Sequence, residues 1–194
     1  PMKNSAKTML FEELKSLDLN ECATVGDIVN AMRHCAFGAR MLGEVANTIR
    51  EMVTAKEKPV IIYSGIPNEP LGLLLKKFVS NQWCREIMLP SDYARRKARG
   101  GNVIVVGAYS ERNADAIYKK PKRAIFINQF DMARPGQIRD GYFPDAVFAD
   151  PRYVMPVIYA ALDEWINGKA GSIGSLIAGL AKYGGLAQQV ARGA

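Results

Sequence analysis

Five short apolar runs between residues 60 and 148 constrain the fold of this chain more than any other sequence feature. Each run lacks the polar alternation of a half-exposed strand, which is typical of strands buried on both faces of a sheet. A polar or glycine-containing turn follows each run, and stretches with helical periodicity separate the runs. The runs cover residues 60–63, 86–89, 103–106, 124–127 and 146–148.

This alternation of strand-like and helix-like segments predicts a parallel sheet, because strands joined through helices form right-handed crossovers. We therefore predict an α/β fold, a three-layer α/β/α sandwich around a five-stranded parallel sheet in flavodoxin-like order. In such a sheet, ligands bind beyond the carboxyl ends of the strands, where the strand order reverses. Functional residues are expected at that edge.

A long N-terminal helix is predicted before the first strand. Thr24 is a favoured N-cap residue, and apolar residues then recur at helical spacing over residues 25–53. Asp150 and Pro151 begin a second long helix that ends at 167, with Asp150 as its N-cap. Short helices are predicted over 71–79, 93–98 and 114–118.

The length of 194 residues predicts a single domain over 1–194, with its core in residues 25–167. The tail over 171–194 has helical, amphipathic character, and the helix over 25–53 offers more apolar surface than one sheet face covers. Large exposed apolar surfaces usually mark interfaces. We therefore expect a homodimer or a homotetramer.

Composition excludes several classes of site. The chain has one histidine and three scattered cysteines, which argues against a disulfide framework or a metal site and indicates a reducing compartment. Cys84 lies beside an apolar run, where a buried, inert thiol is the favoured interpretation.

No apolar stretch is long enough to span a membrane, and residues 2–5 lead into a charged segment. We expect a cytoplasmic protein with no cofactor and no membrane partner.

The formal charge of +7 suggests anionic partners. Basic clusters lie over 95–99 and 119–123, at the amino-terminal edge of the predicted sheet and opposite the predicted pocket. Neither cluster is interleaved with aromatic residues as in single-strand binders. We therefore favour a solvated basic rim over a nucleic-acid groove, and small anionic molecules as ligands.

The turn after the first strand contains Ser64, Gly65 and Asn68. It matches neither the GxGxxG dinucleotide fingerprint nor the GxxxxGK[ST] phosphate loop. A serine and a glycine before a helix can still hold a phosphate through backbone N–H groups. The alternative is a turn that needs glycine and proline only for its geometry. Ser91, after the second strand, is a further candidate ligand-binding residue.

The turn after the third strand presents four polar residues in succession, Ser110, Glu111, Arg112 and Asn113. Ser110 and the following helix N-terminus suit a phosphate, Asn113 suits a hydroxyl group, and Glu111 suits a proton acceptor. Arg112 adds a guanidinium for an anionic ligand. The alternative is that Ser110 or Asn113 caps the helix.

Two further candidates come from elsewhere in the chain. Asp131 follows the fourth strand and points to the same sheet edge. His34 lies within the long helix, where it is either structural or a base donated across a dimer. Glu111 and His34 are thus the candidate catalytic residues.

This layout resembles that of sugar isomerase (SIS) domain proteins, a family of phosphosugar-binding modules. The likeness covers roughly residues 25–167, including serine-containing turns after the first and third strands. The family's third-strand turn commonly reads Ser-x-Ser-Gly-x-(Thr/Ser). The matching stretch over 108–113 keeps one serine, Ser110, and lacks the glycine, and Ser64-Gly65 lacks the family's Gly-x-Gly-x-Ser form.

A second, local resemblance covers residues 24–73. Residues 24–29 and 36–43 are similar to the entry helix of archaeal deoxyhypusine synthases, and residues 64–73 loosely follow their next turn. That family uses NAD and a lysine that forms a covalent intermediate, but no lysine here matches the lysine motif.

These observations lead to two functional hypotheses. The first is a protein that binds a phosphorylated sugar and could interconvert aldose and ketose forms, with Glu111 as the base. The alternative is a non-catalytic ligand-binding or assembly protein, or a deoxyhypusine-synthase-like NAD-binding relative. The incomplete phosphate loop shifts weight toward a non-catalytic role.

Overall fold

The computed structural model describes residues 38–96, 100–128, 146–148 and 151–168. Within these ranges, helices and strands alternate along the chain as the apolar runs predict. The elements are α3 (Gly38–Thr54), β1 (Val60–Tyr63), α4 (Pro70–Ser80), β2 (Ile87–Met88), α5 (Pro90–Arg95), β3 (Asn102–Val106), α6 (Glu111–Lys119), β4 (Arg123–Asn128), β5 (Ala146–Phe148) and α8 (Pro151–Asn167).

The strands form one sheet in the order β2-β1-β3-β4-β5, and every pairing in it is parallel. The prediction of an α/β fold around a parallel sheet is therefore confirmed. In the central pair, Val60 lies opposite Val103 and Tyr63 opposite Val106. The order 2-1-3-4-5 is that of flavodoxin-like sheets, in which the order reverses between β1 and β3.

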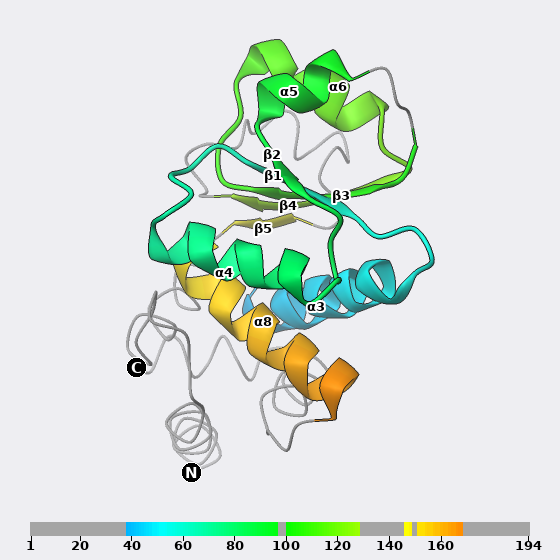
Figure 1. Cartoon of the computed structure of the whole chain (residues 1–194), viewed down its shortest axis with the longest axis vertical. Coiled ribbons are helices and arrows are strands. Elements are labelled where there is room, and N and C mark those ends of the chain that lie inside the picture. The colour runs from blue at the N-terminus through cyan, green and yellow to red at the C-terminus, as the bar shows by residue number, and fades with distance from the viewer. Residues whose placement is uncertain (1–37, 97–99, 129–145, 149–150, 169–194) are drawn as a thin grey trace.

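Helices cover both faces of the sheet (Figure 1), with α5 and α6 on one side and α3, α4 and α8 on the other. Successive strand residues point to opposite faces. Accordingly, Ile61 and Tyr63 pack in the core under α3, α4 and α8, whereas Val60 and Ile62 pack under α5 and α6. Burial on both faces explains why the strand sequences show no polar alternation.

Three helices begin earlier than the sequence analysis predicts, α4 by one residue and α5 and α6 by three. α5 starts at Pro90 rather than at residue 93 and ends at Arg95, and α6 starts at Glu111 rather than at residue 114. Proline is tolerated at the first helical position because its missing N–H would have no intrahelical partner there. Acidic residues in both first turns, Asp92 and Glu111, also favour these starts. Two segments interpreted as turns are therefore first turns of helices.

Cys84 is 3 % exposed and lies in the core beneath α4 and α8. Burial raises the pKa of its thiol to about 12, so the thiol stays protonated at neutral pH. The prediction that Cys84 is buried is confirmed, and a protonated thiol is a weak nucleophile.

Several predicted features lie outside the described residues. They are the predicted N-caps Thr24 and Asp150, the first part of the long helix over 25–37, the tail over 171–194, Cys22 and Cys35. Among the helices that the structure describes, none is both long enough and apolar enough to span a membrane.

Candidate functional site

The turns that follow β1 and β3 meet at the carboxyl edge of the sheet. The Ser64 hydroxyl donates a hydrogen bond to the backbone carbonyl of Ala108, with an Oγ–O distance of 2.7 Å. Gly107 permits this turn because its backbone adopts φ +85°, a conformation that favours glycine. Its N–H donates to the Ile127 carbonyl at 2.8 Å, which fixes the turn to the end of β4.

A cavity of about 490 Å³ opens at this junction, and we call it the serine pocket. It lies beyond the carboxyl ends of β1, β2 and β3, where the strand order reverses and ligands bind in sheets of this kind. Its lining combines three serine hydroxyls, one tyrosine, one amide and several apolar side chains. The lining residues are Ser64, Leu89, Pro90, Ser91, Ala108, Tyr109, Ser110 and Asn113.

Ser110 occupies the N-cap position of α6 but makes no side-chain capping hydrogen bond. Instead, the Asn113 side-chain amide donates to the Ser110 hydroxyl at 3.2 Å, and the Asn113 backbone N–H donates to the Ser110 carbonyl at 3.0 Å. The hydroxyl oxygen is thus an acceptor within the protein. Its own proton is available to a ligand or to water.

Tyr109 forms an aromatic wall of the serine pocket. Its ring packs edge-on against Tyr118 at 6.0 Å and tilted against Phe126 at 6.1 Å between centroids. Burial, and then the hydrogen bond with the Tyr118 hydroxyl, raise the pKa of Tyr109. Its phenol is therefore a neutral structural group at physiological pH.

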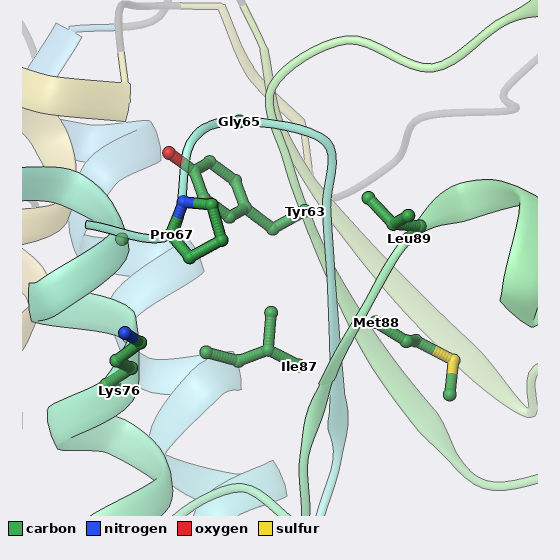
Figure 2. Close-up of a pocket in the computed structure, with 8 residues that line it drawn as sticks. Tyr63, Gly65, Pro67, Lys76, Ile87, Met88 and Leu89 are labelled. Carbon is green, nitrogen blue, oxygen red and sulfur yellow. The ribbon is translucent and has the colours of Figure 1, made fainter. Parts of the chain in front are cut away.

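A second, smaller cavity of about 260 Å³ lies between α4 and the ends of β1 and β2, and we call it the α4 pocket (Figure 2). Leu89 lines both pockets, so the two are neighbours on one edge of the sheet. The residues around the α4 pocket are mostly apolar. They are Tyr63, Gly65, Pro67, Gly72, Lys76, Ile87, Met88 and Leu89.

The structure brings some of the predicted site residues together and separates others. Ser64, Ser91, Ser110 and Asn113 all line the serine pocket. Gly65 lines the α4 pocket instead, although it adjoins Ser64 in sequence. The reason is that neighbouring residues at the end of a strand face opposite sides of the sheet.

Asn68 lies outside both groups of lining residues. Its side-chain oxygen accepts a hydrogen bond from the Lys76 ammonium at 3.3 Å, so it stands beside the α4 pocket. It joins the turn after β1 to the exposed side of α4 rather than contributing to the serine pocket.

Of the two predicted catalytic residues, Glu111 lies within the described part of the chain and His34 does not. Glu111 and Arg112 are exposed in the first turn of α6, and neither is among the residues that line the two pockets. His34 and Asp131 lie outside the described residues.

Sequence reasoning did not assign a role to Tyr109, Leu89 or Pro90. Tyr109, the aromatic residue between Gly107 and Ser110, could have been predicted to pack at the site, because a large apolar side chain in a polar turn generally has a packing partner. The placement of Leu89 and Pro90 depends on how closely β2 approaches the turn after β3, which no local pattern encodes.

Part of the basic rim forms ion pairs and hydrogen bonds within the protein. Arg96 contacts both carboxylate oxygens of Glu86, at 2.5 and 3.0 Å, and this hydrogen bonding lowers the pKa of Glu86. Arg123 pairs with Glu51 at 3.3 Å. Lys120 donates to two backbone carbonyls at the end of α5. These cations therefore contribute to packing between elements.

Within the described ranges, no group of three or more His, Cys, Asp or Glu side chains is arranged to hold a metal ion.

Comparisons of the chain with protein-family models, with curated proteins and with solved structures found no match. The interpretation of the site therefore depends on its own chemistry.

Proposed function

We propose that this protein binds a small phosphorylated, polyhydroxylated molecule, of the sugar-phosphate class, in the serine pocket. The observation that carries the proposal is the state of Ser110. Its hydroxyl stands at the N-terminus of α6, receives a hydrogen bond from Asn113, and makes no capping bond of its own.

The α6 end of the pocket suits the phosphate. The first N–H groups of a helix lack intrahelical partners, and the helix dipole favours negative charge at its N-terminus. The Ser110 hydroxyl adds a donor beside these N–H groups. Arg112, exposed in the same first turn, contributes positive charge nearby.

The β1 end of the pocket suits hydroxyl groups. Ser64 donates its proton to Ala108, so its oxygen lone pairs are acceptors for a ligand O–H. The exposed Ser91 hydroxyl can donate or accept. Tyr109 and Leu89 supply apolar surface for the carbon skeleton. Donors at one end and acceptors at the other thus match a phosphate ester with free hydroxyls.

Binding is better supported than isomerisation. Aldose–ketose interconversion needs a base that moves a proton between adjacent carbons, and the described residues that line the serine pocket include neither a carboxylate nor an imidazole. We therefore propose recognition of the ligand, with no catalytic step at this pocket.

The test is binding of glucose 6-phosphate and fructose 6-phosphate, measured by calorimetry and by thermal unfolding, with glucose and inorganic phosphate as separate controls. At about 100 times the dissociation constant, the ligand should add about 2.7 kcal/mol to the free energy of unfolding. For a chain of this size that corresponds to a rise in Tm of roughly 5–10 °C.

Ser110→Ala should weaken binding of either sugar phosphate about tenfold, because a hydrogen bond to a charged group is lost. The matched control is Ser80→Ala, which removes an exposed hydroxyl from the C-terminal end of α4. If sugar phosphates do not bind at millimolar concentration, or if both variants lose affinity equally, the proposal is wrong.

A further inference from the structure

We propose that the α4 pocket is a second binding site, which takes a small monocarboxylic acid with an apolar tail. This inference does not depend on the sugar-phosphate proposal, because it concerns a different cavity, whose lining residues share Leu89 alone with those of the serine pocket. The pocket has apolar walls and one cation, Lys76, at its side. A nearby carboxylate, that of Glu69, disfavours ligands with more than one negative charge.

The walls of the α4 pocket are apolar. Figure 2 shows Ile87 directed into the space between β2 and α4, with Pro67 and the Tyr63 ring at the turn and Leu89 on the opposite side from Lys76. Leu89 is 48 % exposed although it borders a cavity. An apolar tail that filled the pocket would remove this surface from water, which is favourable.

Lys76 supplies the charge. It is the one basic side chain among the residues that line the pocket, and its ammonium donates to the Asn68 side chain at 3.3 Å. This exposed hydrogen bond uses one N–H of the ammonium and leaves two further N–H donors for a ligand. A carboxylate at the end of an apolar tail meets that requirement.

Glu69 limits the charge that the pocket can accept. Burial, and then the negative charge of Glu69, raise the pKa of Tyr63, which lines the pocket, so this exposed carboxylate lies within electrostatic range of the Tyr63 hydroxyl. A phosphate or a dicarboxylate would bring a second negative charge into the same field. A monocarboxylate therefore fits the α4 pocket better than the ligands proposed for the serine pocket.

Two glycines keep the pocket in its present shape. A side chain at Gly65 would overlap the Tyr63 ring, and one at Gly72 would overlap the backbone carbonyls of Ile66 and Pro67. The turn after β1 therefore packs directly on the first turns of α4. A preformed pocket spares the ligand the cost of ordering it.

The size of the cavity sets the size of the ligand. A volume of about 260 Å³ lies just below the range of roughly 300–1,000 Å³ that is typical of ligand pockets. A fatty acid of about six carbons, rather than a long-chain lipid, is therefore a suitable probe.

The test is a titration of the whole chain with hexanoate and with 1-hexanol, followed by amide chemical shifts in NMR. Hexanoate should give saturable shifts at Tyr63, Lys76, Ile87 and Leu89, and should bind about fivefold more tightly than 1-hexanol, because of its ion pair with Lys76. Lys76→Met should remove that advantage and leave the affinity for 1-hexanol unchanged.

Lys77→Met is the matched control, because Lys77 carries the same charge on the same helix and lies outside the pocket lining. It should leave hexanoate binding unchanged. The proposal is overturned if hexanoate shows no saturation up to about 20 mM, a concentration that detects binding of about −2 kcal/mol. It is also overturned if the alcohol binds as tightly as the acid, or if both lysine variants weaken hexanoate alike. Thermal unfolding of each variant verifies that both remain folded.

Discussion

Ser64 and Ala108 lie 44 residues apart in sequence and are joined by a hydrogen bond of 2.7 Å from the Ser64 hydroxyl to the Ala108 carbonyl. This bond ties the turn after β1 to the turn after β3 across the point where the strand order reverses. It positions the two halves of the serine pocket relative to each other, although neither residue carries a charge.

Ser64→Ala should therefore affect ligand binding more than stability. The residue is exposed, so the free energy of unfolding should fall by only about 0.5–1 kcal/mol. Affinity for sugar phosphates should fall several-fold, because an acceptor and the connection between the turns are both lost. Calorimetry of ligand binding, paired with urea unfolding, separates the two effects. An unchanged affinity would remove Ser64 from the site.

Gly72→Ala should destabilise the protein, although alanine is the better helix former by about 1 kcal/mol. The new Cβ would lie 2.6 Å from the Ile66 carbonyl oxygen and closer still to that of Pro67, and backbone atoms cannot rotate away. We expect a loss of about 1–3 kcal/mol in urea unfolding. Leu73→Ala is the control on the same helix, and since Leu73 is 47 % exposed its cost should be smaller. The reverse ranking would contradict the close packing of the turn on α4.

Cys84 should resist alkylation, and its titration should weaken the fold at high pH. In a Cys22→Ser, Cys35→Ser background, iodoacetamide at pH 8 should modify Cys84 quickly only after denaturation, because the folded thiol is buried.

The direction of the pH effect follows from the raised pKa. The thiol titrates near 8.5 when unfolded and at about 12 when folded, so the unfolded chain releases its proton first. The stabilising contribution is complete below about pH 8.5 and is lost as the pH rises toward 12. Cys84→Ala should show a shallower decline of stability over that range, and a parallel decline in both proteins would contradict this assignment.

Lys120→Met should destabilise the protein more than Lys119→Met. The Lys120 ammonium donates to the backbone carbonyls of Ala94 at 2.5 Å and Arg96 at 2.8 Å, and so joins the C-terminal ends of α5 and α6. We expect a loss of about 1–2 kcal/mol. The Lys119 side chain is 71 % exposed and forms only a surface ion pair with Asp115, which contributes about 0–1 kcal/mol. Chemical denaturation of the two variants gives the comparison, and equal losses would show that Lys120 is a solvated charge as well.

The sequence by itself was sufficient for the strands, the parallel sheet and the sheet edge at which a pocket forms. Apolar runs such as 103–106 predict buried strands because each residue must avoid water on both faces of the sheet. The first residues of the helices were harder to predict from the sequence, because Pro90 and Glu111 are compatible with either a turn or the first turn of a helix. The residues of the serine pocket were predicted only in part. Ser64, Ser91, Ser110 and Asn113 are predicted site residues that line it, whereas Glu111 and Arg112 share a turn with Ser110 but are not among the residues that line its pocket.

Only the tertiary structure decided which of the polar residues share a pocket. Ser64 and Gly65 are adjacent in sequence and line different cavities, whereas Ser64 and Asn113 are distant in sequence and line the same one. Local sequence patterns predict whether a residue is buried or begins a helix, because the preferences for burial and for helix starts depend on residues nearby in the sequence. Which turns meet depends on strand order and on close contacts such as that of Gly72 with the turn before it, and these are properties of the packed chain.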